Sequence, residues 1–235
     1  MNSLRHRCLQ SEIMDRPDLK QDRHWQALRG LERINWLSRS VGNLWPSIRR
    51  LAEESSGLPL RILDVACGAG DLSIGIHRRA AQAGLNVQLE AADISNQALD
   101  HARRRAETAG ARIRFFQMDA LAGDFPSTYD VVFSSLFLHH LKEEQAVIFL
   151  ERLARAAQRM VLISDLARGR LGWMAAYLVT RLLSTSDVVQ TDALLSVEGA
   201  FTPTEALALA HRAGLEGATV VRRWPFRFLL TWRPG

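Results

Sequence analysis

The sequence predicts a doubly wound α/β fold built around a seven-stranded, mostly parallel sheet. Between residues 60 and 165, short apolar runs alternate with stretches that have the apolar period of a helix. A turn made of small residues, 66–70, follows the first apolar run. Parallel strands need crossover connections, usually helices, so this alternation favours a sheet that is covered by helices on both faces.

The chain ahead of this region has a different pattern. Residues 1–20 are polar and are expected to form an irregular arm, whereas residues 22–54 carry apolar side chains at helical spacing. We therefore expect an N-terminal arm with a helical lid at 1–56 and an α/β domain at 57–235.

The alternating region supplies the first five strands and the helices between them. The third strand alternates apolar and polar residues, whereas the first is a nearly continuous apolar run, typical of a central strand in a parallel sheet. The strands are expected at 60–66, 87–92, 112–118, 129–135 and 159–164, and the helices at 71–83, 95–109 and 142–157.

The pattern changes after the fifth strand. Residues 170–184 are expected to form an additional amphipathic helix within an insertion at about 168–200. A later helix begins at Thr202, where Pro203 fits the first helical position and Glu205 closes a capping box. Two final strands, which form a terminal hairpin, are expected at about 218–223 and 227–232.

Composition excludes several classes of protein. With 235 residues and 47% hydrophobic content, the chain suits one globular domain. No apolar run reaches the roughly 18–20 residues of a membrane helix, and residues Met1–Asp15 lack the apolar centre of a secretory signal. The two cysteines, Cys8 and Cys67, exclude a disulfide framework and favour a reducing cytoplasm.

The net charge of +5 would suit a nucleic-acid partner. However, only Lys20 and Lys142 are lysines among the 30 basic residues, and the arginines are scattered along the chain. Nucleic-acid binding is therefore the less favoured interpretation. A small-molecule partner is expected instead, with the protein as a monomer or a homodimer.

The most informative segment is the loop after the first strand. Small residues at Ala66, Gly68 and Gly70 let the backbone turn sharply and approach a ligand closely. The following helix offers its N-terminal amide groups to the same ligand. A tight strand-to-helix turn without a ligand is the alternative.

Acidic residues support the interpretation as a ligand site. Asp64, Asp93 and Asp119 end three strands, and the carboxyl ends of parallel strands form the edge at which open α/β sheets bind ligands. A carboxylate at Asp93 is placed to accept both hydroxyls of a ribose. Helix capping or solvation of a loop is the alternative role for each acid.

These segments resemble the motifs of the class I S-adenosylmethionine-dependent methyltransferases. Residues 64–70 are similar to the first motif of this family, with Ala66 in place of the usual first glycine. Residues 93–94 and 119–120 are similar to its second and third motifs, and residues 129–141 resemble its fourth-strand motif. The resemblance implies a Rossmann-like sheet with the strand order 3-2-1-4-5-7-6.

The resemblance also implies S-adenosylmethionine as the cofactor. This molecule is a sulfonium cation with a nucleoside and no phosphate, so it suits carboxylates, whereas Asp71 at the start of a helix would repel the pyrophosphate of NAD. The implied cofactor-binding residues are Asp64, Ala66, Cys67, Gly68, Gly70, Asp93, Ile94, Asp119, Ala120, Ser134 and Ser135.

Methyl transfer from a sulfonium is a direct displacement that depends mainly on alignment and on the exclusion of water. An oxygen or nitrogen acceptor can still need a base, and His139 and His140 follow the fourth strand beside the expected methyl position. We expect His139 to face the pocket. Packing of one of the two histidines against the following helix is the alternative.

Aromatic residues of the lid and of the insertion are expected to build the acceptor pocket. Trp173, Tyr177 and Arg181 share one helical face at four-residue spacing. Core packing, and a dimer or membrane-surface contact, are the alternatives. The candidate lining residues are Trp25, Trp36, Trp173, Met174, Tyr177 and Arg181.

The function that the resemblance implies is transfer of a methyl group from S-adenosylmethionine to a small molecule. The apolar, aromatic insertion favours a phenolic, polyketide-like or quinone-like acceptor, methylated at oxygen or carbon. An RNA or protein methyltransferase, and a cofactor-binding partner subunit without turnover, are the alternatives. The spacing of cysteine, histidine and aspartate residues indicates no metal site.

Overall fold

The structure is a computed structural model that describes residues 3–10, 12–13, 40–55, 57–184 and 186–235. Of the expected lid, the structure describes α2 (Ser40–Glu54). The rest of that helical segment, with Trp25 and Trp36, lies outside the described residues.

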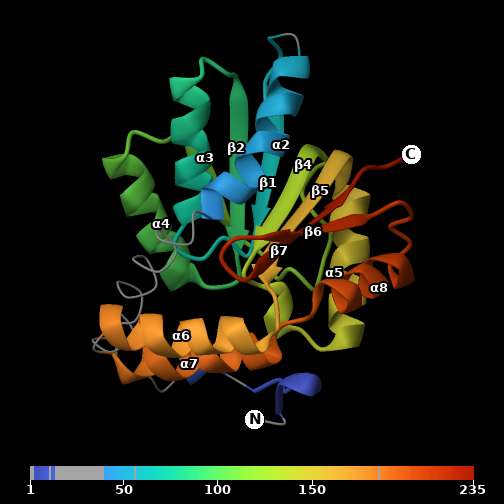
Figure 1. The fold of residues 1–235 in the computed structure, drawn as a ribbon. Coiled ribbons are helices and arrows are strands. Elements are labelled where there is room, and N and C mark those ends of the chain that lie inside the picture. Colours follow the sequence, from blue (N-terminus) through green and yellow to red (C-terminus); the bar gives the residue numbers. More distant parts are fainter. Residues whose placement is uncertain (1–2, 11, 14–39, 56, 185) are drawn as a thin grey trace.

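The described residues form one seven-stranded sheet with the order β3-β2-β1-β4-β5-β7-β6 (Figure 1). The first five strands run parallel, and β7 lies antiparallel between β5 and β6. The predicted α/β class and strand order are therefore confirmed. The strands are β1 (Leu60–Val65), β2 (Val87–Asp93), β3 (Ile113–Gln117), β4 (Tyr129–Ser135), β5 (Ala157–Leu166), β6 (Thr219–Arg223) and β7 (Arg227–Trp232).

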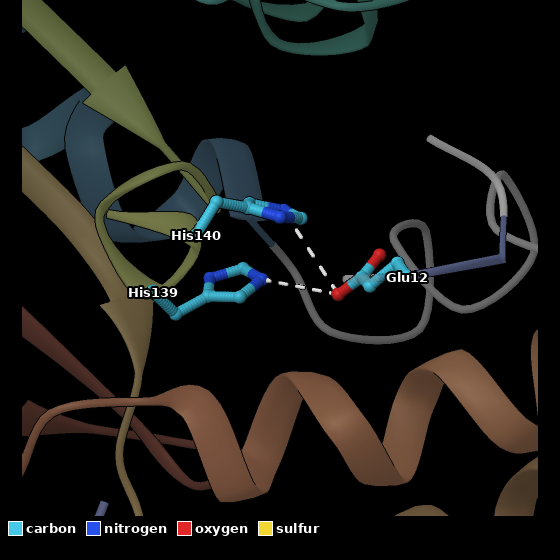
Figure 2. Close-up of side chains that lie close together, drawn as sticks. All are labelled: Glu12, His139 and His140. Carbon is cyan, nitrogen blue, oxygen red and sulfur yellow. Dashed lines mark ion pairs between the residues drawn. The ribbon is translucent and has the colours of Figure 1, made fainter. Parts of the chain in front are cut away.

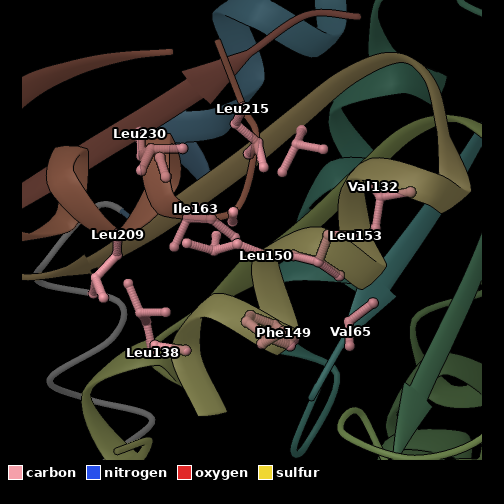
Figure 3. Close-up of a cluster of buried hydrophobic side chains, with 14 of the residues drawn as sticks. Val65, Val132, Leu138, Phe149, Leu150, Leu153, Ile163, Leu209, Leu215 and Leu230 are labelled. Carbon is pink, nitrogen blue, oxygen red and sulfur yellow. The ribbon is translucent and has the colours of Figure 1, made fainter. Parts of the chain in front are cut away.

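Both faces of the sheet are buried because successive strand residues alternate between two hydrophobic clusters. Ile62 and Val131 belong to the cluster beneath α2, whereas their neighbours Leu63 and Val132 belong to the cluster beneath Phe149 of α5, part of which Figure 3 shows. The sequences of the central strands are therefore nearly continuous apolar runs.

Helices cover the two faces of the sheet. α2 and α3 (Asp71–Gln82) supply side chains to one cluster, and α5 (Glu143–Ala156) and α8 (Pro203–Arg212) supply them to the other. α4 (Asn96–Thr108) packs on β2 and β3. The start of α8 has the predicted capping box between Thr202 and Glu205.

The insertion after β5 holds two helices, α6 (Arg170–Leu183) and α7 (Asp187–Gly199), where the sequence predicted one. The two helices lie side by side below the edge at which β5 ends (Figure 1). α7 escaped prediction because its buried residues do not share one stripe. Val188 and Val197 are both buried although they lie on opposite sides of the helix.

The described part of the N-terminal arm contacts α7 and the turn after β4. Arg7 donates hydrogen bonds to the carbonyl oxygens of Gly199, His139 and Leu141, at 2.5, 2.8 and 2.6 Å. The same guanidinium lies 3.8 Å from the centre of the Phe201 ring. One side chain thus joins the arm to two segments, the turn after β4 and the end of α7.

Among the described residues, no helix combines the length and the apolar character that crossing a membrane would require.

Candidate active site

The loop after β1 turns through backbone conformations that favour small residues. Ala66, Gly68 and Gly70 have φ angles of 59°, 53° and 75°. A Cβ atom at Gly70 would lie 3.1 Å from the Cβ of Ala102 in α4, which is tighter than an ordinary contact. The small residues are therefore required by the turn itself, whether or not a ligand binds there.

Asp93, at the end of β2, ties this loop to the next one. Its Oδ2 accepts a hydrogen bond from the amide of Gly68 at 2.8 Å, and its Oδ1 accepts one from the amide of Ser95 at 2.9 Å. The adjacent Ile94 is 62% exposed. An exposed apolar side chain beside a carboxylate can pack on a flat ring whose sugar reaches that carboxylate.

Asp119 follows β3 and is exposed, and its Oδ1 accepts a hydrogen bond from the amide of Leu121 at 2.8 Å. Ala120 is buried beside it. The hydrogen bond to Leu121 stabilises the local turn, which is close to the alternative role, in a cap or loop, considered for this acid. The exposed carboxylate still faces solvent at the same sheet edge as Asp93.

Asp64 differs from the other two acids because it lies inside the protein. It is 1% exposed, and the Ser73 hydroxyl of α3 donates a hydrogen bond to its Oδ2 at 2.6 Å. Burial, reinforced by the charges of Asp93 and Asp71, raises the pKa of Asp64 to about 8, although the Ser73 hydroxyl acts in the opposite sense. In this structure, the Asp64 side chain thus contacts the first turn of α3.

Cys67 also lies within this loop. Burial raises the pKa of its thiol, and the neighbouring Asp64 and Asp93 raise it further. A thiol in this environment is a poor nucleophile.

Hydroxyl groups gather where β4 and β5 end. Ser134 is buried, and Ser135 pairs in register with Ser164 of β5. Within the described part of the chain, the hydroxyls of all three serines are buried without a hydrogen-bond partner. Buried polar atoms are normally satisfied, so these groups are available to a polar ligand.

His139 lies in the short turn Leu138–His140 that follows β4, and it is 5% exposed. Its Nδ1 lies 2.7 Å from Oδ1 of Asp165, and its backbone amide donates a hydrogen bond to the other oxygen of that carboxylate at 3.3 Å. Asp165 is 1% exposed and lies near the end of β5. The buried carboxylate therefore fixes both the turn and the imidazole ring.

The opposite nitrogen of His139 faces the N-terminal arm, as Figure 2 shows. Nε2 of His139 and Nε2 of His140 lie 3.7 and 3.9 Å from the same oxygen, Oε1 of Glu12. The two imidazole rings are 4.2 Å apart between centres. The arm thus closes a cluster of two histidines and two carboxylates.

Charge dominates the protonation of this cluster. Burial alone would lower the pKa of His139, but Asp165 and Glu12 outweigh it and raise that pKa to about 10. Burial would raise the pKa of both carboxyls, but the histidines hold the pKa of Glu12 and of Asp165 below the ordinary values. With Glu12 in this position, His139 is a cation at neutral pH.

The predicted aromatic face of the insertion is present on α6. The rings of Trp173 and Tyr177 stack with centres 5.8 Å apart, and the Arg181 guanidinium lies 3.6 Å from the centre of the Tyr177 ring. The indole of Trp173 donates a hydrogen bond to Glu198 of α7 at 2.9 Å. Met174 is exposed on the same helix. Their contact with an acceptor stays a prediction.

Residues 62–159 match the model of a family described as a methyltransferase domain. This match supports the class I S-adenosylmethionine-dependent methyltransferase family that the motifs resemble. The chain is similar to a demethylmenaquinone methyltransferase of Thermus thermophilus, with 36% identity over 107 residues, or 45% of this chain and 47% of the relative. This chain therefore spans about half the length of that relative.

Two further proteins extend the similarity beyond the family's motifs. A ubiquinone biosynthesis O-methyltransferase of Bordetella parapertussis is 27% identical over 190 residues, or 78% of this chain and 68% of the relative. A solved plantazolicin methyltransferase in complex with S-adenosylhomocysteine superposes with a TM-score of 0.67 at 18% identity. That alignment covers 91% of this chain and 90% of the other.

Sequence reasoning missed two residues of the histidine cluster, Asp165 and Glu12. Asp165 could have been found by the rule that singled out Asp93 and Asp119, because it too lies where a parallel strand ends. Glu12 gave no sequence signal, since it lies in an irregular arm far along the chain from His139.

Proposed function

We propose that this methyltransferase moves the methyl group of S-adenosylmethionine to the oxygen or carbon of a small phenolic, quinone-like or polyketide-like acceptor. The observation that carries the proposal is the link from Gly68 to Asp93, which brings the small-residue loop and the second acidic loop together. The buried His139–Asp165 pair joins the turn after the neighbouring strand β4 to the end of β5.

The residues of this edge fit the chemistry of the cofactor. Asp93 would receive the ribose hydroxyls, Ile94 would pack on the adenine, and Asp119 with the backbone of Ala120 would address the adenine amine. The hydroxyls of Ser134 and Ser135 would meet the polar methionine end, since buried hydroxyls without partners favour a polar ligand. When bound, the cofactor supplies a methyl group on a positively charged sulfur.

The protein's part in the reaction is alignment, exclusion of water and handling of a proton. In the displacement, the bond from carbon to sulfur breaks with its electron pair left on sulfur, and a bond from carbon to the acceptor forms. A hydroxyl acceptor must lose its proton, for which Nε2 of His139 is the candidate, because Asp165 already engages Nδ1. The contact of Glu12 with the histidines must open for an acceptor to reach this nitrogen.

Two observations support the class of acceptor. The relatives are named for demethylmenaquinone and ubiquinone biosynthesis, which concern quinone-like molecules. The insertion carries Trp173 and Tyr177 on one face. In this proposal, the arm and lid at 1–56 and the insertion at about 168–200 enclose the acceptor beside the α/β domain at 57–235.

Calorimetric titration with S-adenosylhomocysteine tests the cofactor half of the proposal. We expect the protein to bind it, Asp93→Ala to abolish binding, and Asp124→Ala, which alters an exposed loop carboxylate, to leave binding unchanged. NAD serves as the control ligand, and no heat of binding is expected with it. Absence of S-adenosylhomocysteine binding to the folded wild-type protein would refute the proposal.

The acceptor half is tested with radiolabelled S-adenosylmethionine. Reduced quinones and simple phenols are offered together with RNA and a protein extract, and products are separated by their chemistry. Label in the quinol or phenol fraction supports the proposal. Label only in RNA or protein, or in no fraction, contradicts it.

A further inference from the structure

The cluster around His139 has the composition of a metal site. Among the residues that the structure describes, Glu12, His139 and His140 each offer one ligand atom, and these atoms lie within 4.8 Å of one another. Figure 2 shows both imidazole rings turned toward the Glu12 carboxylate. Two imidazoles and one carboxylate are a ligand set that suits zinc and other divalent transition metals.

We propose that Glu12, His139 and His140 bind a divalent transition metal ion, with zinc as the preferred ion. Binding of the ion is independent of the proposed methyl transfer. A site with three protein ligands leaves a position open for a further oxygen donor. A metal-bound Nε2 accepts no proton, so the role of His139 as a base that is proposed above belongs to the metal-free protein.

The spacing of the ligand atoms supports the proposal. Oε1 of Glu12 lies 3.7 and 3.9 Å from the two Nε2 atoms, which is beyond hydrogen-bond length. In a tetrahedral zinc site, two ligand atoms that are each about 2.1 Å from the ion lie about 3.4 Å apart. Oε1 of Glu12 therefore lies only a few tenths of an ångström farther from each nitrogen than it would around an ion.

A second layer of contacts holds the ligands in this arrangement. Asp165 contacts Nδ1 of His139 at 2.7 Å, so Nε2 stays available to a metal ion. A carboxylate on the nitrogen that does not bind the metal is common for metal-bound histidines. The Ser196 hydroxyl of α7 donates a hydrogen bond to Oε1 of Glu12. The amide of Ile13, the next residue, donates one to Asp192 of α7 at 2.8 Å.

The charges of the cluster also favour a divalent cation. Glu12 and Asp165 contribute two negative charges in a region where the His139 side chain is 5% exposed. A metal ion that displaces the proton of His139 balances them with its own two positive charges. Imidazole ligands disfavour magnesium and calcium, which prefer oxygen, so the choice falls on the zinc-like ions.

The test measures metal binding by the full chain after treatment with a chelator and its removal by dialysis. Zinc is titrated by calorimetry, and cobalt(II) is titrated by visible absorption, whose intensity reports coordination by protein nitrogen and oxygen. The variants are Glu12→Gln and His140→Ala, and the matched control is His211→Ala, which removes a histidine of α8 outside the cluster.

We expect the wild-type protein and His211→Ala to bind one ion with equal affinity. Glu12→Gln and His140→Ala should each bind at least about 10-fold more weakly, because each loses one ligand. No saturable binding by the wild-type protein overturns the proposal. So does an affinity of either cluster variant equal to that of His211→Ala.

Titration of the same proteins with S-adenosylhomocysteine keeps this inference separate from the proposed function. None of the three substitutions alters the hydrogen bond between Gly68 and Asp93 that joins the two proposed cofactor loops. Cofactor binding should therefore persist in all three variants. Cofactor binding without metal binding overturns only the metal site. Metal binding without cofactor binding overturns only the proposed function.

Discussion

Replacement of Asp64 by asparagine should change how the stability of the protein depends on pH. The carboxyl is 1% exposed, and its pKa is raised from 3.8 to about 8 in the folded protein. Asparagine has nearly the same shape, and its oxygen can still accept the hydrogen bond from Ser73. The substitution therefore removes the titration while it keeps most of the packing.

The sign follows from proton binding in the two states. Between pH 4 and pH 8, the folded protein keeps the proton on Asp64, and the unfolded chain releases it. Ionisation in this window stabilises the unfolded state, so the contribution of Asp64 to stability falls by up to about 1.4 kcal/mol for each pH unit. From pH 5 to pH 7, the stability of Asp64→Asn relative to wild type should rise by up to about 2.7 kcal/mol.

Urea unfolding, followed by tryptophan fluorescence at pH 5, 6, 7 and 8, measures this difference. The other titrating groups are common to both proteins and cancel in the comparison. Asp124→Asn, at an exposed loop position, is the control and should follow the wild-type curve. Parallel curves for wild type and Asp64→Asn would refute the argument, because they would mean that Asp64 titrates alike in the folded and unfolded chains.

The remaining predictions concern packing, the loop and the proton acceptor. Phe149→Ala should lower the free energy of unfolding by about 3–5 kcal/mol, since the ring is fully buried; a loss below 1 kcal/mol in urea unfolding would contradict the packing. Gly70→Ala should cost about 1–2 kcal/mol for the left-handed backbone alone, plus the close approach to Ala102, and should weaken S-adenosylhomocysteine binding in calorimetry. His139→Ala should lower turnover by about 10²–10⁴-fold in the labelled-methyl assay and leave S-adenosylhomocysteine affinity unchanged. Unchanged turnover in this variant would exclude His139 from the reaction.

The fold could be predicted because local rules and tertiary structure agree in this chain. The apolar run at 60–65 becomes a central strand, and the capping pattern at Thr202 becomes the start of α8. α7 was missed because its buried residues depend on α6, which lies beside it, and no one-sided stripe marks it in the sequence.

The candidate site could be predicted only in part, for a different physical reason. Asp93 and Asp119 follow strand ends, so topology alone brings them to one edge. Topology also brings Asp64 there, but its side chain turns inward to Ser73, and side-chain direction at a strand end depends on the loop that follows. The contact of Glu12 with His139 and His140 depends on how an irregular arm docks, which sequence spacing does not encode.

The three hydrogen bonds of Arg7 have a consequence for the order in which the protein is made. Arg7 leaves the ribosome before its partners His139 and Gly199, which lie far behind it in the chain. Domains fold progressively from the N-terminus during synthesis, but this arm has to wait for α7 before it can dock. The histidine cluster is thus completed only after α7 has been made, although Glu12 leaves the ribosome before either histidine.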